Sequence, residues 1–153
     1  MNDNALTAAE YVGFFPRLIA SIIDTIAIFI VLALLGFIGV STGLISVPSV
    51  DGTGAESMGT LGALVQWVVL PAIVILFWRY RGATPGKMVV GAVIVDAETG
   101  DLPTVKQSLG RYLGYILSSI PLGLGFLWII FDDRKQGWHD KLAGTVVIRG
   151  QRS

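Results

Sequence analysis

One uninterrupted apolar run constrains the fold of this chain more than any other feature. It extends from Leu18 to Val40, and crossing a hydrocarbon core takes roughly 20 apolar residues. A second apolar stretch, Leu61–Trp78, contains Pro71, which predicts a kink inside a helix. The chain is 53% hydrophobic and 14% charged over 153 residues, and so small a chain cannot bury that much apolar surface in a core of its own. The sequence therefore predicts an integral membrane protein with spans at about residues 17–40 and 61–79.

A third apolar stretch, Tyr112–Phe131, is interrupted by the helix-breaking segment Ser118–Gly125. By length it is either a third span or a re-entrant helical hairpin. Charge favours the hairpin, because all eleven Lys and Arg residues then lie on one side, opposite the base-free loop Ser41–Thr60. Lys and Arg concentrate on the cytoplasmic side of membranes. We therefore expect a broken re-entrant hairpin at about residues 105–131, in a multi-pass protein of the bacterial inner membrane with both termini cytoplasmic.

Two β-branched segments, Met88–Val95 and Gly144–Arg149, are predicted strands. They share the cytoplasmic compartment if the third stretch is re-entrant, so they can pair into a small two-stranded β-ribbon. Thr104 and Gln107 have the spacing of a capping box and predict a helix that starts at about Val105. The expected fold is a single all-α membrane domain over residues 1–153, with a cytoplasmic insert at about 80–104 and a cytoplasmic tail at 132–153.

Composition and spacing argue against several functions. The chain has no cysteine, which excludes disulfides, thiol nucleophiles and iron–sulfur clusters. Eleven basic residues balance eleven acidic ones, so no net charge attracts nucleic acid. Only three residues separate Gly82 from Gly86-Lys87, and Met88 follows, so this loop lacks the Walker spacing. We expect neither an enzyme nor a cofactor.

Asp24 is the most informative charged residue. An acid within a span costs about 2.5–3.5 kcal/mol on insertion scales, which makes it a functional candidate. Arg17 and Ser21 lie on the same helical face as Asp24. Two interpretations are open: Asp24 takes part in ion transfer, or Asp24 pairs with an arginine of the hairpin, Arg111, and locks the helices together.

Two further features bear on packing and chemistry. Gly110, Gly114 and Ser118 follow one another at every fourth position, which is typical of a surface for close helix contact. In the polar tail, His139 lies beside Asp140. This pair either relays protons near neutral pH or forms an interfacial turn bonded to Arg17 or to the loop.

Three motifs resemble those of the RDD family, small bacterial membrane proteins named for one arginine and two aspartates. The opening motif, Phe14–Asp24, contains Arg17; the central one, Thr84–Lys87, precedes a Val/Ile strand that ends in Asp96. The closing motif, Trp138–Thr145, contains Asp140 as the second aspartate. The resemblance covers nearly the whole chain and implies transport, with sodium/proton antiport reported for some members.

We therefore expect a transport protein for a small cation or proton. In this interpretation Asp24 carries the ion and Arg17, Arg111 and Asp140 tune it. The supporting candidates are Ser21, His139 and Lys87, and a metal role is left open. The alternative is a non-transporting scaffold or accessory subunit that holds a protein partner or anionic lipid on its basic cytoplasmic face.

The expected partners are membrane lipids and further copies of the chain. Two spans and a hairpin are too few helices to enclose a path, and the broken backbone of the hairpin needs protein cover. A homo-oligomer, most simply a dimer, meets both needs.

Overall fold

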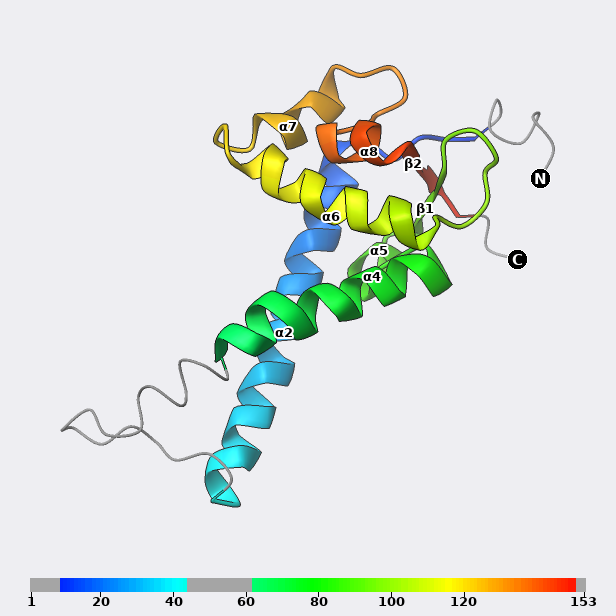
Figure 1. Cartoon of the computed structure of the whole chain (residues 1–153). Coiled ribbons are helices and arrows are strands. Elements are labelled where there is room, and N and C mark those ends of the chain that lie inside the picture. Colours follow the sequence, from blue (N-terminus) through cyan, green and yellow to red (C-terminus); the bar gives the residue numbers. More distant parts are fainter. Residues whose placement is uncertain (1–8, 44–61, 151–153) are drawn as a thin grey trace. The chain divides into compact units, whose positions relative to one another are not determined.

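A computed structural model describes residues 9–43 and 62–150 of the chain (Figure 1). The described part is mostly helical and contains one two-stranded antiparallel sheet. The chain divides into two compact units, residues 25–73 and the remainder, and each is considered by itself. In chain order the elements are α2 (Phe14–Ser41), a π-helical turn (Val65–Val69), α4 (Leu70–Arg81), α5 (Pro85–Val89), β1 (Ala92–Asp96), α6 (Val105–Ser119), α7 (Leu124–Leu127), a 3₁₀ turn (Trp128–Ile130), α8 (Trp138–Ala143) and β2 (Thr145–Arg149).

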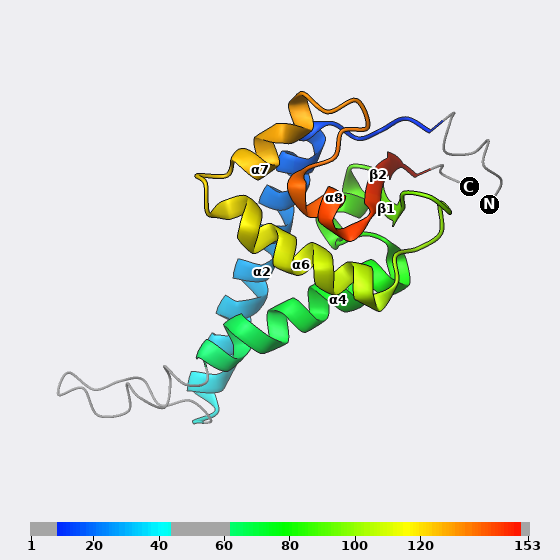
Figure 2. The same cartoon turned by 45° about the horizontal axis from the view of Figure 1, so that its top comes forward.

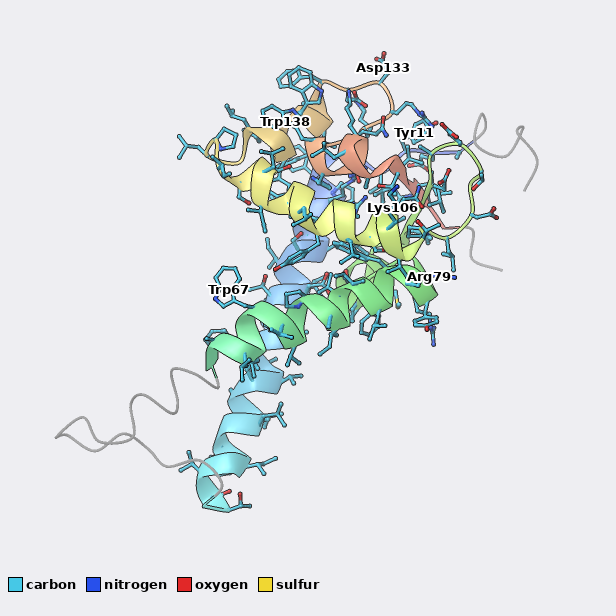
Figure 3. All side chains as sticks on the ribbon, viewed as in Figure 1. Tyr11, Trp67, Arg79, Lys106, Asp133 and Trp138 are labelled. Atoms are coloured by element: carbon cyan, nitrogen blue, oxygen red, sulfur yellow. The ribbon has the colours of Figure 1, made fainter. Side chains whose placement is uncertain are left out.

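Two helical stretches are long and apolar enough to cross a membrane, as the sequence predicts. They are Phe14–Ser41 and Gly62–Val89, each of 28 residues. Only 6% of the most apolar 18-residue window in each stretch is buried, and Figure 3 shows Trp67 projecting from the second stretch. Such exposure of apolar side chains is expected where a helix faces lipid.

The irregularity expected at Pro71 takes the form of the π-helical turn just before it. In this turn the N–H of Leu70 donates to the carbonyl of Val65, one residue further back than in an α-helix. Proline has no N–H to donate, and a widened turn is a common way for a helix to absorb that loss. The helix then continues to Arg81, two residues beyond the predicted end of the span at residue 79.

The predicted helical break is confirmed as a bent helix pair. Val105–Ser119 and Leu124–Ile130 meet at an angle of 112°. The backbone reverses at Leu122 and Gly123, whose φ angles of 52° and 79° lie in the left-handed region. The capping box at Thr104 and Gln107 is also confirmed, because each side chain bonds the backbone N–H of the other residue.

Helix α6 has a polar buried face and an apolar exposed face. Gly114 and Ser118 are buried with Arg111, whereas Leu109 and Leu113 are about half exposed or more. Helix α8 lies alongside the buried face, as Figures 1 and 2 both show. The small-residue spacing therefore serves contacts within the chain, and the apolar face is left for lipid.

The two predicted strands pair with each other, but the first begins later than expected. β1 and β2 are antiparallel, with Ala92 opposite Arg149 and Asp96 opposite Thr145. The predicted strand Met88–Val95 is wrong at its start, where the chain forms helix α5 instead. Pro85 occupies the first turn of α5, where proline favours a helix.

The segment before α2 adds a third piece of chain to this sheet, which the sequence does not predict. Tyr11 bridges to Ile148, and the N–H of Val12 donates to the carbonyl of Val147 at 2.9 Å. Residues close to the two ends of the described chain therefore lie side by side.

Helix contact at Gly114 gives a direct test of the packing between α6 and α8. A Cβ added at Gly114 would lie 2.6 Å from the Cα of His139, so Gly114→Ala must displace α8. We expect a loss of about 1–3 kcal/mol in the free energy of unfolding, measured by reversible unfolding in mixed micelles.

The matched control is Gly110→Ala in the same helix. Its nearest contact would be the Cα of Ala143 at 3.9 Å, an ordinary van der Waals distance. This variant should be unchanged or more stable by up to about 1 kcal/mol, because alanine favours helix over glycine. Equal stability of the two variants would contradict the packing.

Candidate functional site

Asp140 lies at the centre of a buried charge cluster formed by three helices. Its Oδ2 accepts hydrogen bonds from Nη1 of Arg17 at 2.5 Å and from the N–H of Gly137 at 3.0 Å, and its Oδ1 accepts from Nη1 of Arg111. Arg111 and Asp140 are fully buried, and Arg17 nearly so. We call Arg17, Arg111 and Asp140 the Arg–Asp–Arg cluster. It joins α2, α6 and α8.

Arg17 has a partner at every nitrogen. Besides Asp140, its Nε donates to the carbonyl of Val12 at 2.9 Å and its Nη2 to the carbonyl of Lys135 at 2.6 Å. The interpretation of the His139-Asp140 turn as bonded to Arg17 is thereby confirmed. Because every nitrogen of Arg17 already donates a hydrogen bond, a contact with Asp24 would require breaking one of these bonds.

The arginines determine the ionisation of Asp140. Burial alone would raise the pKa of Asp140, but the positive charges of Arg111 and Arg17 outweigh it and hold this pKa well below the ordinary value. The carboxylate therefore stays ionised, which suits a fixed connection between helices and not a group that exchanges protons.

His139 packs among aromatic rings beside this cluster. Its ring stacks on Tyr115 with centroids 4.3 Å apart and lies 5.2 Å from Phe126. Burial lowers the pKa of His139 to about 3, with the attraction of Asp140 opposing that shift and repulsion from Arg111 adding to it. The imidazole is thus neutral at physiological pH, which argues against the proton-relay interpretation.

Asp24 occupies a separate polar site, on α2 but away from the arginines. Its Oδ2 accepts from the hydroxyl of Thr84 at 2.5 Å, and its Oδ1 accepts from the N–H of Gly86 at 2.7 Å. Within the part of the chain that the structure describes, Asp24 forms no ion pair. The interpretation in which Asp24 pairs with Arg111 is wrong, because the ion-pair partner of Arg111 is Asp140, and Nη1 of Arg111 also donates to Thr145 at 2.7 Å.

Gly86 is required for this arrangement. A Cβ at Gly86 would collide with the carbonyl oxygen of Ala20 and would lie 2.9 Å from the Cγ of Asp24. The central motif Thr84–Lys87 thus supplies both donors to Asp24 through a close backbone approach. The motif is recognisable in the sequence, but its contact with Asp24 is not, because no local pattern relates residues so far apart.

The supporting candidates fall at different places. The hydroxyl of Ser21 donates to the carbonyl of Arg17 within α2 at 2.9 Å. Lys87 is buried, and its Nζ lies 5.6 Å from the ring centroid of Trp78. No group of three or more His, Cys, Asp or Glu side chains suited to a metal ion occurs among the described residues.

The Arg–Asp–Arg cluster predicts a large penalty for removing its acid. Asp140→Asn leaves two buried arginines without a counter-charge, so we expect a loss of roughly 3–5 kcal/mol in the free energy of unfolding. The control is Glu10→Gln, which breaks the exposed pair Glu10–Arg149, 3.2 Å apart, and should cost less than about 1 kcal/mol. Similar losses in the two variants would show that Asp140 is no more important than a surface acid.

His139 predicts a pH-dependent stability that one substitution removes. Its pKa falls from 6.5 in the unfolded chain to about 3 in the folded one, so below pH 6.5 the unfolded state takes up a proton that the folded state does not. Stability should therefore fall by about 2 kcal/mol between pH 7 and pH 5.

His139 is the single histidine of the chain, so His139→Gln should flatten the stability profile between pH 7 and pH 5. Melting curves across that interval measure both proteins. An unchanged slope in the variant would contradict a neutral, buried imidazole.

Comparison with known proteins identifies relatives but few described activities. The chain is 45% identical over 82 residues to an uncharacterized protein of Rickettsia prowazekii, covering 54% of this chain and 45% of that protein. It is 31% identical over 148 residues to an uncharacterized protein of Bacillus subtilis, covering 89% of this chain and 95% of that one. A proline-rich antigen homolog of Mycobacterium tuberculosis is 30% identical over 95 residues, covering 58% and 40%.

The chain thus spans less than half the length of the Rickettsia and Mycobacterium relatives and nearly all of the Bacillus one. No solved structure matches it significantly. The model of the RDD family matches residues 11–144, a range that includes Arg17, Asp24 and Asp140. The chain belongs to the RDD family.

Proposed function

We propose that this protein moves a proton or small monovalent cation across the membrane, and that Asp24 binds the ion. One observation carries the proposal. Asp24 is the single acid of the two candidate spans, and its hydrogen-bond partners among the described residues, Thr84 and Gly86, are neutral donors.

Asp24 has no oppositely charged partner within the described residues, and this matters for the binding and release of a proton or cation. An arginine partner would occupy the oxygens of the carboxylate and compete with a bound cation for them. The hydroxyl of Thr84 and the amide of Gly86 stabilise the carboxylate of Asp24. Because neither donor is charged, neither competes with a bound cation for that carboxylate. The Thr84 oxygen also has lone pairs that a cation can use.

The Arg–Asp–Arg cluster has a different role in this proposal. It holds α2, α6 and α8 together and so positions Asp24 from a distance. Arg17 and Asp140 therefore act as positioning residues, and not as groups that tune the carboxylate directly. This revises the expected role of Arg17, Arg111 and Asp140 at the ion site.

The strand pairings support the proposed membrane arrangement. β1 precedes α6 and β2 follows α7, yet the two strands pair. A bent pair that crossed the membrane would separate them, so the pairing favours a re-entrant hairpin. The bridge between Tyr11 and Ile148 likewise favours two termini on one side, and the positive-inside rule makes that side cytoplasmic.

A homo-oligomer completes the proposal. The apolar outer face of α6 and the exposed tip at Leu122 need lipid or protein around them. Two spans and one hairpin enclose no path by themselves, so the ion pathway would run where copies of the chain meet, most simply in a dimer.

Asp24→Asn separates transport from the scaffold alternative. Asparagine keeps the shape of the side chain but cannot carry charge, so we expect flux in proteoliposomes to be abolished. Stability should fall by only about 1 kcal/mol, the net value of one hydrogen bond, because no arginine among the described residues is left unpaired.

The control for that experiment is Asp101→Asn, the same chemical change at an exposed acid in the turn before α6. It should leave flux and stability unchanged. An Asp24→Asn protein with undiminished flux would reject the carrier role, and wild-type liposomes without flux for protons or alkali cations would favour a scaffold.

Accessibility of single cysteines tests the proposed topology. The chain has no cysteine of its own, so single cysteines can be placed at Ser49, Thr99 and Gln151, of which Ser49 and Gln151 lie outside the described residues. They should react from the periplasmic, cytoplasmic and cytoplasmic sides respectively. Reaction of the Gln151 cysteine from the periplasm would mean that the third apolar stretch crosses the membrane.

A further inference from the structure

Trp78 and the neighbouring Arg111 carry buried hydrogen-bond donors that have no acceptor among the described residues. The indole Nε1 of Trp78 and the Nε and Nη2 of Arg111 are buried and have no hydrogen-bond partner in the described part of the chain. The guanidinium carbon of Arg111 lies 5.4 Å from the Trp78 ring centroid, and Nζ of Lys87 lies 5.6 Å from it. We call Trp78, Lys87 and Arg111 the donor group.

All of these atoms donate and none accepts. Indole, guanidinium and ammonium groups carry N–H donors only. The Tyr115 hydroxyl lies close enough to Arg111 to act on it through a side-chain hydrogen bond, but Nε and Nη2 have no partner of ordinary hydrogen-bond geometry within the described chain. Buried donors of this kind are rare in folded proteins, where they usually bind an acceptor such as an ion or a water molecule.

The charges around the donor group are also unbalanced. Among the described residues, the buried cations are Arg17, Lys87 and Arg111, whereas the one buried carboxylate is Asp140. His139 contributes no charge, since it is neutral. Adding the half-buried Asp24 still leaves one positive charge in excess.

The buried and half-buried carboxylates Asp140 and Asp24 do not supply the missing negative charge. Both oxygens of Asp140 are already bound by Arg17, Arg111 and Gly137. Both oxygens of Asp24 accept from the loop that contains Thr84. Cation–π contact with Trp78 offsets part of the desolvation of Lys87 and Arg111, but it brings no negative charge.

We propose that the donor group binds one small monovalent anion of the halide or nitrate class. One excess positive charge calls for one negative charge. Nε and Nη2 of Arg111 form one edge of the guanidinium, which suits an anion, and the ammonium and indole N–H add two more donors. A small, weakly hydrated anion loses less hydration on burial than phosphate or sulfate, so burial of these donors favours it.

This anion site is independent of transport. It would neutralise the interior beside the Arg–Asp–Arg cluster whether or not Asp24 exchanges an ion. Its presence would make the stability of the folded protein depend on the identity of the salt, at constant ionic strength, through ordinary binding linkage.

Direct binding of radioactive chloride to the purified full chain tests the proposal. The chain is held in detergent micelles or nanodiscs at fixed ionic strength, with gluconate as the replacing anion. We expect saturable binding that approaches one chloride per chain, competition by bromide and nitrate, and a melting temperature that rises as chloride saturates.

Two variants assign the binding to the donor group. Lys87→Gln removes one cation, and Trp78→Phe removes the indole donor but keeps an aromatic ring. Each should weaken chloride affinity by roughly tenfold or more, the effect expected for losing one hydrogen bond to a charged group. The control is Lys106→Gln, the same change at an exposed lysine of α6 labelled in Figure 3, which should bind chloride like the wild type.

The outcomes are decisive in either direction. Absence of saturable chloride binding by the wild-type chain would overturn the proposal. Binding that neither Lys87→Gln nor Trp78→Phe weakens would place the anion elsewhere and overturn it as well. If Lys87→Gln fails to fold, Trp78→Phe, which keeps every charge, decides alone.

Discussion

The buried carboxylate of Asp140 is the group on which the rest of this structure depends. It accepts hydrogen bonds from Arg17 of α2, from Arg111 of α6 and from Gly137 at the start of its own helix. A charge removed from water is stable only with its partners in place, so the start of α2 is connected to α6 and α8. The polar groups consequently lie inside and the apolar side chains of α6 outside, an arrangement that suits lipid and not water.

The same carboxylate determines the surroundings of Asp24. Because both arginines are committed to Asp140, Asp24 is left to the neutral donors of the central motif, Thr84 and Gly86. Asp140 is thus held in its ionised form, whereas Asp24 lacks an ion-pair partner within the described chain. The described residues also include three buried cations, Arg17, Lys87 and Arg111, but one buried carboxylate, Asp140.

Local patterns predicted the parts of the fold that local physics controls. The two apolar stretches, the capping box at Thr104 and the break between α6 and α7 each depend on neighbouring residues, and the structure contains all of them. The predicted start of β1 is too early, because the first residues of the β-branched segment Met88–Val95 belong to the short helix that begins at Pro85. The bridge at Tyr11 gave no signal, since a single bridge needs no repeating pattern.

By itself, the sequence determined that the chain belongs in a membrane, where its helices start and break, and which charged residues are unusual there. These properties follow from composition, periodicity and the cost of placing charge in hydrocarbon. Only the tertiary structure determined which acidic residue pairs with which basic residue. Arg17 and Asp140 are 123 positions apart, and Asp24 and Gly86 are 62 apart, so their contacts depend on how the helices pack. The sequence suggested Arg111 as a partner for Asp24, but the close contact of α8 with Gly114 brings Asp140 to Arg111 instead.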